Sequence, residues 1–167
     1  MDHLWAPWRL SYVSTPKPPG SPVEECFVCK ALADTDDRKH RIVRRTPLSA
    51  VILNTFPYNN GHLLVVPHNH VGRLDQLSAE QSAELQRTIC DMIAALEKLM
   101  SPQGFNVGLN LGAAAGAGLP GHLHWHIVPR WNGDTNFMPV VADTKVISQS
   151  LDALYELLAC ELASRAA

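Results

Sequence analysis

The fold is decided by the run Gly121-His122-Leu123-His124-Trp125-His126-Ile127-Val128-Pro129-Arg130. Apolar residues and histidines alternate along it, which predicts a β-strand with one buried face. Leu123, Trp125 and Ile127 would face the core, and the three histidines would share the other face, about 6.6 Å apart at a rise of about 3.3 Å per residue. Because a ladder of titratable rings contributes nothing to packing, we interpret this face as functional.

The rest of the sheet is expected from four further stretches. They are an edge strand near Ile42-Val43 and strands at Ser49–Asn54, His62–Pro67 and Phe105–Leu111. In the last of these, Phe105, Val107 and Leu109 are predicted to face inward. Two helices accompany the strands: one begins at the capping box Ser78–Gln81, and an amphipathic tail runs from about Lys145 to Ala163. Since strands and helices do not alternate as βαβ units, we predict an α+β domain with five mainly antiparallel strands.

The composition indicates one soluble domain. The 167 residues are 46% hydrophobic and 18% charged, and the net charge of −2 gives no electrostatic reason to expect nucleic acid or an acidic membrane as partner. No apolar run has the length of a membrane span, and the N-terminus lacks a signal-peptide pattern, so we expect a cytoplasmic protein. Residues 1–24 are expected to form an aromatic arm and a proline-rich linker, and residues 25–167 a single domain.

Two of the four cysteines are spaced as Cys26-Phe27-Val28-Cys29. In a reducing compartment such a pair is more typical of a metal site than of a disulfide, and two thiolates with two imidazoles form a tetrahedral zinc site. A closed site of this kind would be structural, and no organic cofactor is expected. The sequence alone leaves the two histidines open among His40, His62, His68, His70 and His122.

A loop of small residues, Gly112–Gly121, leads into the histidine run. Without large side chains its backbone N–H groups can approach an anion closely, and Gly112, Gly116 and Gly118 are the candidate binding positions. Histidine is a competent nucleophile near neutral pH because most of it is unprotonated. Together, the loop and the ladder indicate a phosphate group bound next to a nucleophile.

These motifs resemble those of the histidine triad family. The resemblance covers about residues 25–131 and is carried by His122–Val128, by Asn60–Pro67 and by Asn110 with Gly112. Within the family, Leu4–Arg9 and Pro129–Phe137 are similar to the bacterial diadenosine tetraphosphate phosphorylase branch. The resemblance implies a five-stranded antiparallel sheet with two helices, and a homodimer that joins two sheets into one of ten strands.

The resemblance also implies roles for individual residues. His124 would be the nucleophile that attacks the α-phosphorus, His126 and His62 would contact the phosphate, and Asn110 would contact the phosphate or the leaving group. Asn54 falls where the family places a ribose ligand. The zinc ligands of the family correspond to Cys26, Cys29, His70 and His122, which removes His122 from the chemistry.

The loop departs from the family in one respect. Other branches carry a serine or threonine shortly before the triad, whereas residues 112–121 contain no hydroxyl group. A polyphosphate leaving group needs little acid assistance, so this loop favours a small-molecule dinucleoside polyphosphate, such as diadenosine tetraphosphate, as substrate. The alternatives are a Hint-like nucleoside phosphoramidate hydrolase and a nucleotide-binding module whose activity is incidental.

Overall fold

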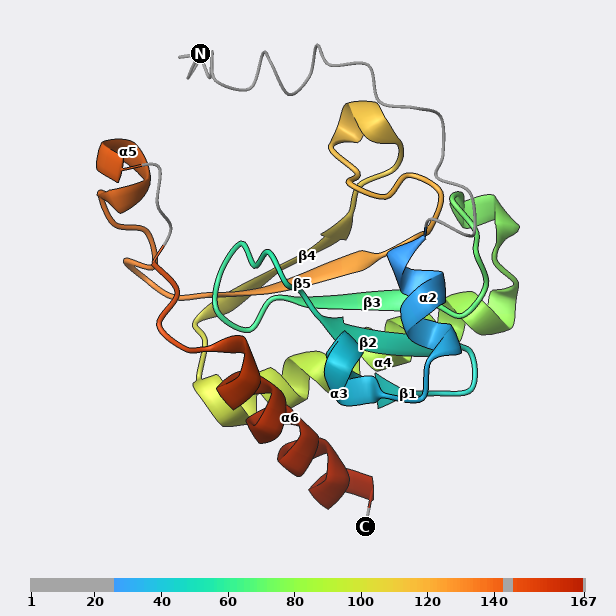
Figure 1. Cartoon of the computed structure of the whole chain (residues 1–167), viewed down its shortest axis with the longest axis horizontal. Helices are drawn as coiled ribbons and strands as arrows, with labels where there is room; N and C mark the ends of the chain where they lie inside the picture. The colour runs from blue at the N-terminus through green and yellow to red at the C-terminus, as the bar shows by residue number, and fades with distance from the viewer. Residues whose placement is uncertain (1–25, 143–145, 167) are drawn as a thin grey trace.

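The computed structural model describes residues 26–142 and 146–166, so the expected arm and linker at residues 1–24 lie outside the described part. One five-stranded sheet forms its centre, in the order β1-β2-β3-β5-β4 (Figure 1). All neighbouring strands pair antiparallel. The strands are β1 (Ile42–Arg45), β2 (Ser49–Leu53), β3 (Leu63–Pro67), β4 (Gly104–Leu109) and β5 (Trp125–Arg130). The predicted α+β class is confirmed.

Two long helices accompany the sheet. They are α4 (Ala79–Met100) and α6 (Leu151–Ala166). The described ranges also contain the short helices α2 (Phe27–Ala33), α3 (Asp37–His40) and α5 (Met138–Ala142). The predicted capping box opens α4, since Ser78 Oγ accepts from Gln81 N and the Gln81 side chain accepts from Ser78 N. Within the described ranges, no helix is both long enough and apolar enough to cross a membrane.

The central strands are buried on both faces. Alternate residues of β2 and β3 divide between two apolar clusters, as the two-residue period of a strand requires. One cluster packs Val51, Leu53, Leu63 and Val65 with the buried stripe of α4. The other packs the intervening residues with α2 and with Leu119 of the small-residue loop. The second cluster therefore holds α2 and the loop on the face of the sheet opposite α4.

The histidine run is only partly strand, which corrects the prediction. β5 begins at Trp125, and His122 and His124 precede it. Ladder pairing with β3 ends at the pair Val65↔Trp125, because the Leu123 N–H instead donates to the carbonyl of Val71 at 2.7 Å. His122 therefore does not continue the strand that carries His126, and the three histidines do not form one regular ladder.

The predicted start of the C-terminal helix was wrong, and one inward-facing residue of β4 is more exposed than its orientation suggests. Helix α6 begins at Leu151 rather than near residue 145, with Ser150 Oγ accepting from Ala153 N, and Val146 lies outside the helix and is exposed. Val107 faces inward as predicted, since it pairs directly with the core residue Ile127, but it is 45% exposed. β4 is an edge strand, and α4 packs mainly beneath β2, β3 and β5, so the inward face of β4 lacks a full cover.

Candidate functional site

Four side chains from three distant parts of the chain meet beside α2. The ligand atoms of Cys26, Cys29, His70 and His122 all lie within 4.8 Å of one another. Cys29 Sγ lies 3.2 Å from His70 Nδ1 and 3.5 Å from His122 Nδ1, and Cys26 Sγ lies 3.4 Å from His122 Nδ1. Of the five candidate histidines, this cluster brings His70 and His122 to the cysteines.

The donor set fits a zinc ion. Zn²⁺ bonds of about 2.3 Å to sulfur and about 2.0 Å to nitrogen put neighbouring tetrahedral S and N atoms about 3.5 Å apart, close to the separations found. His122 Nε2 lies 2.9 Å from the Pro67 carbonyl, which can only accept, so Nε2 carries the proton and Nδ1 is free to bind metal. Burial, with the neighbouring Cys26 thiol, raises the pKa of Cys29 to about 11, so its thiolate needs a cation nearby.

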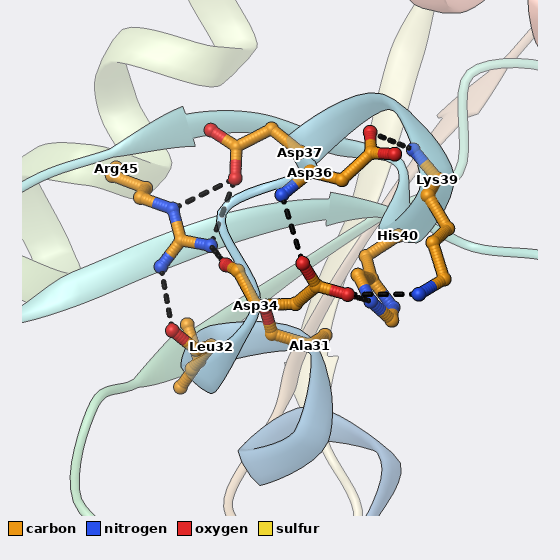
Figure 2. Close-up of polar contacts among 8 residues, drawn as sticks. All are labelled: Ala31, Leu32, Asp34, Asp36, Asp37, Lys39, His40 and Arg45. Carbon is orange, nitrogen blue, oxygen red and sulfur yellow. Dashed lines mark hydrogen bonds and ion pairs between the residues drawn. The ribbon is translucent and has the colours of Figure 1, made fainter.

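A polar network fixes the segment that carries the cysteines (Figure 2). The guanidinium of Arg45 in β1 donates to the carbonyls of Ala31, Leu32 and Asp34, where α2 ends. The Asp34 carboxylate in turn accepts from Lys39 Nζ and His40 Nε2 of α3, at 2.8 and 2.9 Å. These bonds tie α2 and α3 to the edge of the sheet. They also show that His40, a candidate zinc ligand, is instead paired with Asp34 and belongs to no metal cluster among the described residues.

The partners of His124 define its tautomer. Nδ1 lies 2.8 Å from the carbonyl oxygen of His122, which can only accept, so Nδ1 carries the proton. Nε2 then has a free lone pair. The ring is buried except where it lines a cavity, so an unprotonated nitrogen is available to attack a group bound there.

The imidazoles of His62 and His126 form a hydrogen-bonded chain in which each ring accepts at Nδ1 and carries its proton on Nε2, the reverse of His124. The backbone N–H of Tyr58 donates to His62 Nδ1 at 2.9 Å, so His62 Nε2 carries a proton and donates to His126 Nδ1 at 2.9 Å. His126 Nε2 must then carry its own proton, and it has no hydrogen-bond partner among the described residues. Burial and the neighbouring His124 lower the pKa of His126 to about 4, so the ring is a neutral donor at pH 7.

A cavity of about 530 Å³ opens on the rings of His124 and His126, whereas His62 is buried behind His126 and does not line it. Its walls come from α2, from β2 and its following turn, and from the small-residue loop. They include Phe27, Asn54, Tyr58, Leu119, His124 and His126. Of the expected nucleotide-binding residues, Asn54, Gly116 and Gly118 line this cavity. Gly112 does not; it lines a separate hollow with Arg73.

Asn110 lies beside the loop rather than on the cavity wall. A methyl group placed on Gly116 would lie 3.8 Å from Asn110 Nδ2, so the amide lies next to the loop at Gly116. Gly116 has φ +91° and Gly112 φ +77°, conformations that favour glycine, and Gly112 opens the short turn Ala113–Ala115. The turn directs the loop toward His124.

Tyr58 is a site residue that sequence reasoning missed. Its ring stacks on His126 with 5.5 Å between centroids and 19° between planes, and it lies 4.6 Å from the His62 ring. Together with its backbone bond to His62, it sets the direction of the hydrogen-bonded chain. The only hint in the sequence is its place in the turn just before His62, where the Asn60-Gly61 chemistry attracts attention first.

This combination of fold and site defines a class. The HIT domain model matches residues 36–133, and the chain belongs to the histidine triad family. It is 39% identical to the AP-4-A phosphorylase of Mycobacterium tuberculosis over 98% of this chain and 85% of that protein. It is 35% identical to the asymmetrical bis(5'-nucleosyl)-tetraphosphatase of Schizosaccharomyces pombe, over 56% of this chain and about half (51%) of that protein.

Solved structures agree on the fold. A Zn-bound histidine triad family protein from Mycobacterium smegmatis superposes with a TM-score of 0.69 at 24% identity, over 87% of this chain and 98% of that chain. At this identity the likeness shows the shared architecture of sheet and helices.

Proposed function

We propose that this protein is a nucleotidyl transferase or hydrolase that cleaves dinucleoside polyphosphates, above all diadenosine tetraphosphate, with phosphate or water as acceptor. The observation that carries the proposal is the tautomer of His124, whose Nδ1–H is held by the His122 carbonyl, together with the place of its ring on the cavity wall. The names of the phosphorylase and the tetraphosphatase to which the chain is similar support the same substrate class.

The reaction would proceed in two displacements. His124 Nε2 forms a bond to the α-phosphorus as the bond to the bridging oxygen breaks, and the nucleoside polyphosphate leaves as an anion. The His122 carbonyl stabilises the resulting cationic ring, and the Nε2–H of His126 donates to a non-bridging oxygen. An oxygen of phosphate or water then attacks the same phosphorus. The N–P bond breaks, His124 returns to its neutral form, and with water as acceptor a proton is released.

The cavity walls suit one nucleotide. Asn54 would bind the ribose hydroxyls, and the backbone N–H groups of Gly116 and Gly118 would bind phosphate oxygens. We infer a supporting role for Asn110, whose amide lies next to the loop, and for Gly112, whose turn shapes it. The apolar Phe27 is placed to contact the base.

The absence of a proton donor for the leaving group in the small-residue loop favours a polyphosphate substrate. The loop contributes the buried side chain of Leu119 to the cavity wall. Residues 112–121 contain no hydroxyl group that could protonate a departing group. A polyphosphate leaves as a stable anion without that proton, whereas an amine does not. This favours dinucleoside polyphosphates over phosphoramidates.

We further propose a structural zinc ion on Cys26, Cys29, His70 and His122. Their geometry supports it, and the ion would join α2 to the sheet with no ligand position open for catalysis. A reducing cytoplasm would preserve these thiols, which are free in the structure. The family resemblance also suggests a homodimer, which we assign to the edge of β4.

Product analysis tests the function. Incubation of diadenosine tetraphosphate with and without phosphate should give ATP and ADP with phosphate as acceptor, or ATP and AMP with water. His124→Ala should abolish both product sets. His68→Ala, which alters an exposed histidine, should leave them unchanged. Faster turnover of adenosine phosphoramidate would favour the Hint-like alternative, and nucleotide binding with no turnover by the native protein would favour the binding module.

A further inference from the structure

We propose that a second cavity, beside Tyr58, binds the distal nucleoside of the dinucleoside polyphosphate, an inference that rests on the function proposed above. This cavity of about 200 Å³ lies over the outer ends of β4 and β5 and is lined by Asn106, Val128, Arg130 and Thr135. Tyr58 lines both this cavity and the larger one. One aromatic ring therefore stands between the catalytic histidines and a separate polar hollow.

The two cavities lie along one face of β5, since His126 lines the first, and Val128 and Arg130 line the second. His126, Val128 and Arg130 alternate on one face of β5, so Arg130 lies about 13 Å along the strand from His126 at a rise of about 3.3 Å per residue. Gly108 of β4 pairs directly with His126, and directly paired residues point to the same face. Among the described residues, no atom lies within 4 Å of where a Gly108 Cβ would stand. A phosphate chain leaving the α-phosphorus has open backbone to cross here.

The charge of the second cavity suits a neutral group. Arg130 donates to the Asp134 carboxylate through Nε at 2.6 Å and Nη2 at 2.9 Å, and Asp134 also accepts from Asn59 at 2.8 Å. The guanidinium is thus neutralised by a carboxylate held in place from several sides. An anionic phosphate gains little from such a balanced pair, whereas a nucleoside gains hydrogen bonds without having to displace a counter-ion.

Oriented donors remain for that nucleoside. Arg130 Nη1 donates to Asn106 Oδ1 at 2.7 Å, which fixes the orientation of the amide and leaves its two N–H donors without a partner among the described residues. Of the five guanidinium N–H groups, three are used in these bonds, and two remain. Ribose oxygens and purine ring nitrogens can accept hydrogen bonds from the Asn106 amide and from the Arg130 guanidinium. The half-exposed Tyr58 ring adds an aromatic surface for the base.

Equilibrium binding tests the subsite without relying on turnover. Three ligands are compared: AMP, adenosine tetraphosphate, and diadenosine tetraphosphate, the last two with a methylene group in place of the α–β bridging oxygen. The native protein should bind the dinucleotide analogue about tenfold more tightly than the mononucleotide analogue, as expected for one stacked and hydrogen-bonded base. Asn106→Ala should reduce this ratio to about threefold or less and leave AMP binding unchanged. Asn132→Ala, an exposed asparagine outside the cavity, is the matched control.

A second variant tests the path between the cavities. Gly108→Val places a side chain in open space on a strand, so the protein should fold normally. The added side chain should weaken both polyphosphate analogues several-fold more than it weakens AMP, whose chain ends at the α-phosphate beside His126.

Two results would overturn the subsite: equal affinity of the native protein for the two analogues, or an equal loss for all three ligands in Asn106→Ala. The proposed function fails separately, through absence of turnover of unmodified diadenosine tetraphosphate by the native protein. The binding ratios decide the subsite in either case.

Discussion

The three histidines of the triad differ because each has a different partner. His122 donates through Nε2 to the Pro67 carbonyl and presents Nδ1 to the cysteines. His124 donates through Nδ1 to the carbonyl of His122 and keeps Nε2 free. His126 accepts at Nδ1 from His62, which leaves it a donor at Nε2. Backbone carbonyls and a second imidazole thus suit the three rings to the proposed roles of metal ligand, nucleophile and hydrogen-bond donor within five residues.

His122→Ala and His124→Ala should therefore fail in different ways. We expect His122→Ala to lower the free energy of unfolding by on the order of 3 kcal/mol, because a metal ligand is lost. His124→Ala should keep native stability and lose turnover by more than about 10³-fold. Thermal melting, zinc content and initial rates measured on the same preparations check both.

Metal removal provides the control for this pair. Chelation should lower the Tm of the native protein and of His124→Ala, and it should leave His122→Ala nearly unaffected. A native Tm that does not change in the metal-free form would contradict a structural role for the ion.

Among the elements, β4 has the clearest row of backbone hydrogen-bonding groups without a partner strand in the described part of the chain. Within the part of the chain that the structure describes, it pairs only with β5, and residues 106–108 along it are exposed. An edge strand of this length presents unpaired backbone groups to another strand. Together with the half-exposed Val107, this supports pairing of two β4 strands into a ten-stranded sheet.

Val107→Lys tests that dimer. The side chain is already accessible, so the lysine should leave the monomer folded, but it would bring like charges together across paired β4 edges. Sedimentation equilibrium should show a dimer for the native protein and at least a tenfold weaker association for the variant. A native monomer, or a variant dimer of unchanged affinity, would contradict the assignment of the interface to β4.

The elements were largely predictable because their rules are local. The apolar runs on either side of the Asn60-Gly61 turn predicted β2 and β3, and alternation predicted most of β5. The capping box predicted the start of α4. The first turn of the histidine run was not predictable, because Leu123 leaves the ladder for a carbonyl of a distant loop. Alternation gave the correct inward orientation of Val107, but it could not predict the high exposure of this side chain. That exposure follows from the position of β4 at the edge of the sheet, which depends on the topology of the whole chain.

On the scale of the whole molecule, the site depends on contacts between distant segments. Residues alone suggested a cysteine–histidine site with five candidate histidines, and the family resemblance selected His70 and His122, which the fold brings to the cysteines. Tyr58 and the second cavity needed the packing of the turn before β3 against β5, where Asn59 donates to the Pro129 carbonyl. No spacing in the sequence encodes that contact.

The central claim is that His124 becomes covalently bound to the nucleotide. The most direct measurement is mass spectrometry of native protein quenched during turnover of diadenosine tetraphosphate, with peptide mapping of residues 122–126. We predict an adenylyl group on His124 Nε2, which is absent in His124→Ala and lost when phosphate or water completes the reaction. Turnover at the native rate with no adduct under any quench condition, or an adduct on His126 in place of His124, would contradict the account.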